Sequence, residues 1–297
     1  MTPLMIEVAL NGVTSKERNQ HVPRTPQEVA ADGLRCLGAG ASIVHNHIDL
    51  VTTDGEAAAG RYLEAWRLIW EVRPDAIVYP TVGFGSSVQE RYAHIPVLAA
   101  CGHMRMSLWD TGSVNLGGVA ANGLPGGAFD FVYVNTFSDI LYVAEQCGTH
   151  RLAPSIAVFE PGFLRTVLAY RRAGRLPAGA FVKLYFGGDC DYLTGAPGGV
   201  SFGLPPTRQA LEAYLAMLDG TEIPWAVAVI GGDVLESGLA REAVQRGGHV
   251  RVGLEDYAGR RTPSNEELVR EVTQLATQLG RPIASCETAA ELLGFPA

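Results

Sequence analysis

Basic clusters and long apolar segments are both missing from this sequence of 297 residues, which has a formal net charge of −8 at pH 7. Without a cluster of Lys and Arg, nucleic acid and anionic membrane surfaces are disfavoured as main partners, so we expect a small-molecule ligand. No segment approaches the roughly 18 uninterrupted apolar residues of a membrane-spanning helix. Residues 1–12 also lack the basic start of a signal peptide, so a cytoplasmic location is expected.

Cysteine is scarce as well: the five cysteines are widely scattered, and none belongs to a CxxC pair. An odd number at such spacing argues against a disulfide framework, so we expect reduced and mostly buried thiols. The sequence does contain the material for a core, because 47% of the residues are apolar and 18% are charged. These values favour an ordinary folded globule over a disordered chain.

Short β-rich runs alternate with amphipathic stretches of helical period, which predicts repeated βα units around a parallel sheet. The nine candidate strands cover residues 4–10, 42–48, 76–82, 104–109, 131–135, 155–160, 181–187, 225–230 and 249–255. A (β/α)8 barrel, or TIM barrel, needs eight of them. We place residues 131–135 outside the barrel, because only a short Gly-rich stretch, 117–127, separates them from the preceding strand. No linker interrupts the pattern, so we expect a single α/β domain over residues 1–297.

Helices are expected between these strands. Residues 25–40 carry the clearest signals, with Thr25 as the N-cap, Pro26 at the first helical position and Gly38 near the end. Further helices are predicted over residues 56–72, 137–148, 206–219, 234–246 and 264–280.

The most suggestive motif is the histidine pair in "GASIVHNHIDL", where His45 and His47 stand two residues apart at the end of an apolar run. In an extended strand, residues two apart point to the same face, so the two imidazoles could hold one metal ion. The alternative is a polar strand end whose histidines are only hydrogen-bonded. The HxH spacing alone does not decide between the two.

Other polar residues also follow predicted strands. Catalytic groups of TIM barrels gather at the C-terminal ends of the strands and in the loops after them. Such positions are held here by Thr81, Ser113, Asn115, Glu160, Arg251, Glu255 and Asp256. Two imidazoles and a carboxylate from another strand make a site suited to a divalent metal that acts as a Lewis acid.

Arg251 and Asp256 form a possible acid–base pair at the last predicted strand. Arg251 and Glu255 share one face of an extended strand, and Asp256 lies where the chain turns into a loop. A guanidinium within about 4–6 Å would keep the Asp256 carboxyl ionised and oriented, ready to take a proton. The alternative is a buried ion pair that only fixes the last strand.

Together these motifs resemble a known family. "GASIVHNHIDL", "YPTVGF", "SLWDTGSVN", "VNT" and "GGHVRVGLEDY" are similar, in order and spacing, to segments of the β-keto acid cleavage enzymes. The resemblance implies a zinc-dependent TIM barrel, commonly a homotetramer, that converts a β-keto acid and acetyl-CoA into acetoacetate and a new acyl-CoA. It also implies that His45, His47 and Glu255 bind the metal, and that Arg251 and Asp256 handle the proton.

The resemblance suggests substrate contacts too. Thr81 takes the place of a serine in a family loop, and Ser113 and Asn115 match a hydroxyl and an amide that look like donors to the substrate carboxylate. Turn and capping roles are the alternatives for all three. Thr14 stands where a member with an amine-bearing substrate has an acidic residue. Because a buried ammonium would lack a counter-ion beside Thr14, we expect the substrate tail to be neutral or anionic.

Two other functions remain open from the sequence. A metal-dependent hydrolase of the amidohydrolase kind also begins with HxH on a barrel strand, but it needs further histidines on later strands. The predicted strands 155–160 and 181–187 contain none. A non-catalytic protein that binds metal or acyl-CoA is the second alternative, because a metal site alone does not establish turnover. Formation of acetoacetate that depends on acetyl-CoA would distinguish all three.

Overall fold

The computed structural model describes residues 1–120 and 122–295, and its main feature is a sheet of eight parallel strands. In order across the sheet, the strands are β3 (Ile77–Pro80), β2 (Ile43–Asn46), β1 (Ile6–Ala9), β10 (His249–Val252), β9 (Trp225–Ile230), β8 (Phe181–Gly187), β7 (Ala153–Val158) and β4 (Met106–Asp110). The edge strands β3 and β4 pack against each other, so the sheet nearly closes into a barrel. The predicted (β/α)8 TIM-barrel fold is therefore confirmed.

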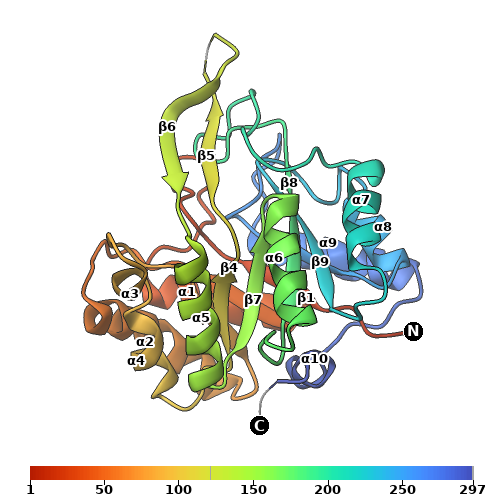
Figure 1. Cartoon of the computed structure of the whole chain (residues 1–297). Coiled ribbons are helices and arrows are strands. Elements are labelled where there is room, and N and C mark those ends of the chain that lie inside the picture. Colours follow the sequence, from red (N-terminus) through yellow and green to blue (C-terminus); the bar gives the residue numbers. More distant parts are fainter. Residues whose placement is uncertain (121, 296–297) are drawn as a thin grey trace.

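Helices surround the barrel and connect its strands, as Figure 1 shows. They are α1 (Pro26–Ala39), α2 (Gly55–Val72), α3 (Val88–Arg91), α4 (His94–Ala99), α5 (Phe137–Thr149), α6 (Pro161–Arg172), α7 (Arg208–Leu218), α8 (Leu239–Gln245), α9 (Asn265–Gln278) and α10 (Cys286–Leu293). Across the described ranges, none of them has the length and apolar character needed to cross a membrane.

Helix α1 follows its sequence signals closely. Thr25 is the N-cap and forms a capping box with Glu28, and Pro26 is the first helical residue, as predicted. The last helical residue is Ala39, close to Gly38 as predicted, and the chain leaves the helix at Gly40, which adopts the left-handed conformation with a φ of 116°. Elsewhere, α3, α4, α6 and α10 were not predicted, and α8 begins at Leu239 instead of residue 234.

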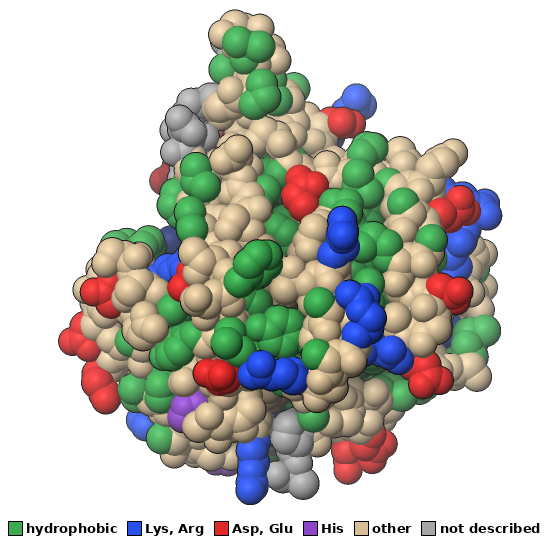
Figure 2. All heavy atoms as spheres, in the orientation of Figure 1, with side chains coloured by type: hydrophobic (Ala, Val, Ile, Leu, Met, Phe, Trp, Pro, Cys, Tyr) green, Lys and Arg blue, Asp and Glu red, His purple; other side chains and the backbone are tan. Residues whose placement is uncertain are grey.

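A hairpin outside the barrel separates β4 from α5. It consists of β5 (Val114–Val119) and β6 (Pro125–Tyr133), which pair antiparallel and project from the barrel in Figure 1. Residues 131–133 belong to β6, so their predicted place outside the barrel is confirmed. Of the Gly-rich stretch 117–127, residues 117–119 belong to β5 and residues 125–127 belong to β6. Figure 2 shows exposed apolar side chains on this arm, where Leu124 is 62% exposed.

The interior of the barrel is partly polar. Glu7, Lys183 and Arg251 are between 0% and 3% exposed, although their strands consist mostly of apolar residues. Arg251 and Lys183 both approach the Glu7 carboxylate, so the three side chains meet inside the barrel. Barrel interiors are usually filled by branched apolar side chains, so this polar layer needs a reason beyond packing.

Candidate functional site

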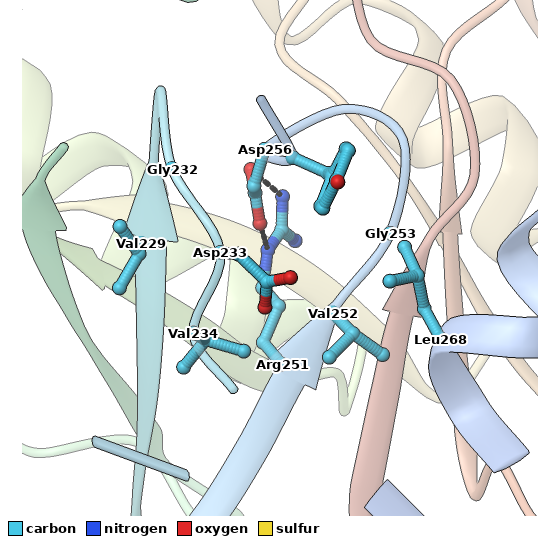
Figure 3. A pocket seen from close by; sticks show the side chains of 10 residues that line it. Val229, Gly232, Asp233, Val234, Arg251, Val252, Gly253, Asp256 and Leu268 are labelled. Atoms are coloured by element: carbon cyan, nitrogen blue, oxygen red, sulfur yellow. Dashed lines mark hydrogen bonds and ion pairs between the residues drawn. The ribbon is translucent and has the colours of Figure 1, made fainter. Parts of the chain in front are cut away.

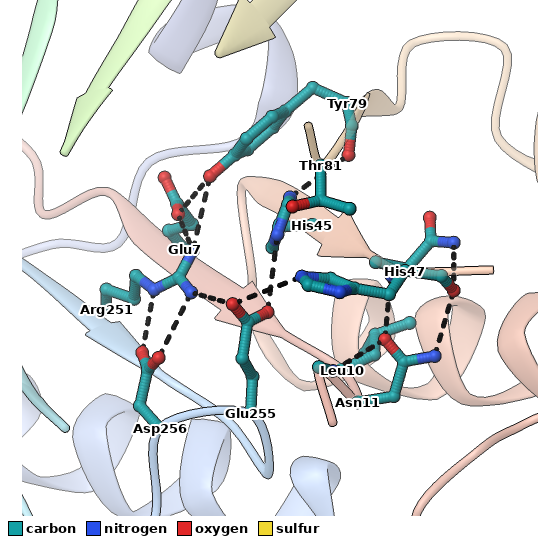
Figure 4. A network of polar contacts seen from close by, with 12 residues as sticks. Glu7, Leu10, Asn11, His45, His47, Tyr79, Thr81, Arg251, Glu255 and Asp256 are labelled. Carbon is teal, nitrogen blue, oxygen red and sulfur yellow. Dashed lines mark hydrogen bonds and ion pairs between the residues drawn. The ribbon is translucent and has the colours of Figure 1, made fainter. Parts of the chain in front are cut away.

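His45, His47 and Glu255 converge at the C-terminal ends of neighbouring strands. His45 lies in β2 and His47 directly follows it, whereas Glu255 lies in the loop after β10. Strands β2 and β10 both pair with β1, which brings these distant segments together. The Glu255 oxygens Oε2 and Oε1 lie 3.3 Å from His45 Nε2 and 3.3 Å from His47 Nε2 (Figure 4). One ligand atom from each of the three residues lies within 4.8 Å of the others.

Two glycines allow the backbone to place Glu255. Gly253 has a φ of +138°, and a Cβ at this position would lie 2.0 Å from the carbonyl oxygen of Ala9. Gly12 has a φ of +50°, and a Cβ there would lie 2.4 Å from Cγ of Glu255. A larger residue at either position would therefore displace the β10 loop or the Glu255 side chain.

Hydrogen bonds position the imidazole of His45 and the backbone of His47. His45 Nδ1 lies 3.2 Å from the carbonyl oxygen of Tyr79, which can only accept a hydrogen bond. The proton of neutral His45 therefore sits on Nδ1, and the lone pair of Nε2 points toward Glu255. Asn11 holds the His47 backbone from both sides, because its Oδ1 accepts from His47 N (2.8 Å) and its Nδ2 donates to His47 O (3.0 Å).

The donor set fits a divalent cation. Within the described part of the chain, His47 Nε2 and Glu255 Oε2 are buried without a hydrogen-bond partner, which is costly unless something else binds them. Burial lowers the pKa of His45 to about 4, so this imidazole is neutral at pH 7. Burial raises the pKa of Glu255, but its interactions with His47, His45 and the Arg251 guanidinium outweigh burial and hold this pKa well below its usual range. Neutral imidazole and ionised carboxylate are the forms that bind metal ions.

Arg251 connects these three residues to Asp256. Its guanidinium donates to both Asp256 oxygens, over 2.7 Å from Nε and 3.1 Å from Nη2, and Nη2 also lies 3.2 Å from Glu255 Oε1. Burial raises the pKa of the Asp256 carboxyl, and the Arg251 charge offsets this only in part. Figure 3 shows that the pair also borders a small pocket at the ends of β9 and β10. A buried carboxylate with a raised pKa is a group that can accept a proton.

Three further residues of this network were missed at the level of sequence. Glu7 Oε1 accepts from Arg251 Nη1 (2.7 Å) and from the Tyr79 hydroxyl (2.6 Å), and Lys183 Nζ donates to the same hydroxyl (2.9 Å). Burial lowers the pKa of Lys183, although the Glu7 charge opposes this effect. The signal that could have revealed Glu7 and Lys183 is a single charged residue inside an otherwise apolar strand.

Asp110 was also missed, at the C-terminal end of β4. The Tyr133 hydroxyl donates to its Oδ2 over 2.5 Å, so the projecting hairpin is tied to the mouth of the barrel. Burial raises the pKa of Asp110, while the Tyr133 hydrogen bond and the charge of Lys183 lower it in part. Its sequence context, "SLWDTG", is typical of an ordinary strand end and does not predict this contact.

The structure brings one of the predicted substrate contacts close to the histidines. Thr81 directly follows β3, in which Pro80 pairs with Asn46, so Thr81 lies beside the end of β2 that carries the histidines. Ser113 is engaged elsewhere, because its hydroxyl donates to the Asn135 carbonyl (3.0 Å) and accepts from Asn135 N (2.8 Å). Asn115 lies exposed on β5, opposite Val132. Ser113 and Asn115 are thus joined to the hairpin and not to the histidine cluster in the described residues.

Thr14 is buried beside Leu254, the residue that precedes Glu255. Its hydroxyl donates to the carbonyl oxygen of Leu254 over 2.6 Å, and Arg18 Nη1 lies 3.5 Å from the same hydroxyl. A guanidinium therefore stands beside the position that was expected to set the charge of the substrate tail.

Solved structures share the fold. The apo structure of ObcA superimposes with a TM-score of 0.66 at 17% sequence identity, and the match covers 93% of this chain and 66% of the ObcA chain. At this level of identity the likeness concerns the barrel and not the chemistry.

Sequence comparisons are more specific. The 3-keto-5-aminohexanoate cleavage enzyme of Fusobacterium nucleatum is 30% identical, over 99% of this chain and 99% of that protein. The 3-oxoadipate:acetyl-CoA acetyltransferase of Cupriavidus necator is 26% identical, over 99% of this chain and 95% of that protein. The model of the beta-keto acid cleavage enzyme family matches residues 3–295. The chain therefore belongs to the beta-keto acid cleavage enzyme family.

Proposed function

We propose that this chain is a metal-dependent acyltransferase that converts a β-keto acid and acetyl-CoA into acetoacetate and a new acyl-CoA. The observation that carries the proposal is the convergence of His45, His47 and Glu255 with the buried Arg251–Asp256 pair at the C-terminal end of the barrel. The name of the Cupriavidus necator relative supports acetyl-CoA as the co-substrate. A homotetramer and a cytoplasmic location stay predictions.

His45 Nε2, His47 Nε2 and a Glu255 carboxylate oxygen would hold the metal, which we expect to be zinc. When bound, it would polarise the ketone of the β-keto acid and acidify the carbon between ketone and carboxylate. The unpartnered atoms of His47 and Glu255 support this assignment, because the fold leaves them buried with lone pairs to share.

Asp256 is the group that would take the proton from this carbon. Arg251 donates two hydrogen bonds to Asp256, which fixes the carboxylate in the orientation needed for proton transfer. In the overall reaction, the bond between C2 and C3 of the keto acid breaks, and C2 joins the acetyl carbonyl carbon. Coenzyme A leaves the acetyl group and takes the remaining acyl group, so no external oxidant or reductant is required.

Thr81 would contact the substrate carboxylate from the end of β3, beside the end of β2 that carries the histidines. For Ser113 and Asn115 the same role rests on the family resemblance alone. The Ser113 hydroxyl would have to exchange its contacts with Asn135 to reach a substrate.

The test is to incubate the purified protein with a panel of β-keto acids, with and without acetyl-CoA, and to follow acetoacetate and acyl-CoA products by mass spectrometry. The proposal predicts that both products appear together and only when acetyl-CoA is present. Cleavage without acetyl-CoA would indicate a hydrolase instead. Binding of acetyl-CoA with no product from any acid would indicate a non-catalytic protein.

Metal content is measured separately by elemental analysis of the active protein. We expect about one divalent ion per chain, with zinc the most abundant. Full activity in a preparation free of transition metals would refute the metal-dependent form of the proposal.

A further inference from the structure

A second pocket, of about 240 Å³, lies beside the candidate metal site at the C-terminal end of the barrel. It is lined by three arginines together with neutral residues, and its described lining includes neither Asp nor Glu. The lining residues are Thr14, Arg18, Asn19, Thr194, Gly195, Leu254, Tyr257, Ala258, Gly259, Arg260, Arg261 and Thr262. In a chain with a net charge of −8, such a concentration of positive charge is unexpected.

Arg18 carries much of this charge without a compensating carboxylate. Its guanidinium donates to the backbone carbonyls of Tyr192 and Tyr257 and lies 3.5 Å from the Thr14 hydroxyl. Among the described residues it has no Asp or Glu oxygen within 4.0 Å. The acidic residue whose charge raises the pKa of Arg18 most is Asp191. Its Oδ1 already accepts hydrogen bonds from the N–H groups of Leu193 and Thr194. A half-buried guanidinium bound only to neutral groups keeps its charge available for a ligand.

The other two arginines differ from each other. Arg261 is neutralised by Glu271 at 2.6 Å and by Asp233 at 3.3 Å. Arg260 is exposed, and no ion pair joins it to an acidic group of the described ranges. Arg18 and Arg260 are therefore the two open charges of this pocket.

The pocket adjoins the proposed catalytic residues through Thr14 and Leu254. The Thr14 hydroxyl donates to the Leu254 carbonyl over 2.6 Å, and Leu254 directly precedes Glu255 and Asp256 in the chain. Its walls come from the loops after β1, β8 and β10, all at the end of the barrel where the metal ligands meet. A molecule bound at the metal ligands can therefore extend toward Arg18.

We propose that this pocket binds an oxyanion of one of the two substrates, with Arg18 as the main donor and Arg260 at its rim. Carboxylate and phosphate oxygens match the fork of N–H groups that a guanidinium presents. The inference rests on the proposed function, which supplies two sources of such a group. One is a second carboxylate at the far end of the β-keto acid, and the other is a phosphate of coenzyme A.

Binding measurements by calorimetry test the pocket without requiring turnover. One pair of ligands is 3-oxoadipate and 3-oxohexanoate, which differ only in the terminal carboxylate. The other pair is coenzyme A and 3′-dephospho-coenzyme A, and inorganic phosphate serves as a minimal probe. Each is measured on wild type, on Arg18→Gln and on Arg270→Gln, an arginine on α9 that is exposed and paired with Glu266.

In Arg18→Gln we expect the affinity for one anionic ligand to fall about 10- to 100-fold, the usual effect of losing a charge-assisted hydrogen bond. Loss confined to 3-oxoadipate assigns the pocket to the substrate tail, and loss confined to coenzyme A assigns it to a phosphate. Arg270→Gln should bind all ligands like wild type. Equal affinity of Arg18→Gln and wild type for every ligand would overturn the inference.

Arg18 also ties two loops together, so the glutamine variant can fail to fold. Arg18→Lys keeps the charge, and Arg260→Gln removes the exposed charge without touching the loop contacts. The inference then requires two results. Arg260→Gln must weaken binding of the same ligand, and Arg18→Lys must bind this ligand more tightly than Arg18→Gln does. If wild type binds 3-oxoadipate through Arg18 but forms no acyl-CoA, the proposed reaction fails while the pocket stands.

Discussion

The role of Asp256 can be tested by the change Asp256→Asn. The wild-type carboxylate accepts two hydrogen bonds from Arg251, over 2.7 Å and 3.1 Å. Asparagine keeps the shape and one oxygen acceptor, but its amide group faces a second N–H donor of Arg251. Most importantly, asparagine cannot take up a proton at neutral pH.

The size of the effect follows from these contacts. Losing a positioned base lowers the rate by roughly 10²- to 10⁴-fold. Stability should fall by only about 2 kcal/mol, the cost of one hydrogen bond to a charged group, because Arg251 keeps its contacts with Glu7 and Glu255. Asp256 is not among the three proposed metal ligands, so metal content should not change.

The assay is acyl-CoA formation under saturating acetyl-CoA, together with elemental analysis and the unfolding midpoint of the same preparation. Asp233→Asn is the matched control, since Asp233 borders the same small pocket in Figure 3 but pairs with Arg261 instead of Arg251. We expect the control to keep near wild-type activity. Asp256→Asn with activity within about tenfold of wild type, and with intact metal, would place the base on another residue.

Three further predictions concern other residues. His45→Ala or His47→Ala should abolish both metal content and turnover while circular dichroism stays that of a folded barrel; a variant that keeps a full complement of metal would contradict the ligand assignment. Thr14→Glu should raise the kcat/KM for 3-keto-5-aminohexanoate relative to that for 3-oxohexanoate. The shift should be larger in the double variant with Arg18→Gln, because in the single variant Arg18 would pair with the new carboxylate. Burial lowers the pKa of His249 to about 3, well under the value of about 6.5 in an unfolded chain, so acidification below pH 6.5 favours the unfolded state. Between pH 7 and pH 5, urea unfolding should show that wild type loses about 2 kcal/mol more than His249→Asn, and equal pH dependence would refute this reading.

The barrel was predictable because its strands and most of its long helices carry local sequence signals, although α3, α4, α6 and α10 were not predicted. Alternating β-rich and amphipathic stretches fix the number of βα units, and Thr25 with Pro26 marks the start of α1. The hairpin was harder, because β5 contains consecutive glycines and its register shifts between Gly117 and Gly118. Strand propensity is low in such a segment, so pairing with β6 and not local preference makes it a strand.

Part of the candidate site could also be predicted from the sequence, and part could not. The period of two places His45 and His47 on one face, so their convergence could be inferred from the sequence. The contact of Glu7 with Arg251 could not, because it depends on the pairing of β1 with β10, at opposite ends of the chain. The same holds for Arg18, whose loop contacts with Tyr192 and Tyr257 exist only once the barrel has formed.

The charges inside the barrel indicate why the reaction suits an acid as substrate. The connected carboxylates are Glu7, Glu255 and Asp256, and the connected cations are Arg251 and Lys183, which leaves one formal negative charge in excess. An uncompensated buried charge is costly. A divalent cation at the histidines would turn this excess into one positive charge, and the carboxylate of a β-keto acid would then cancel it. We infer that the cluster is closest to electrical balance with both metal and substrate bound, so the carboxylate common to all β-keto acids is recognised by charge.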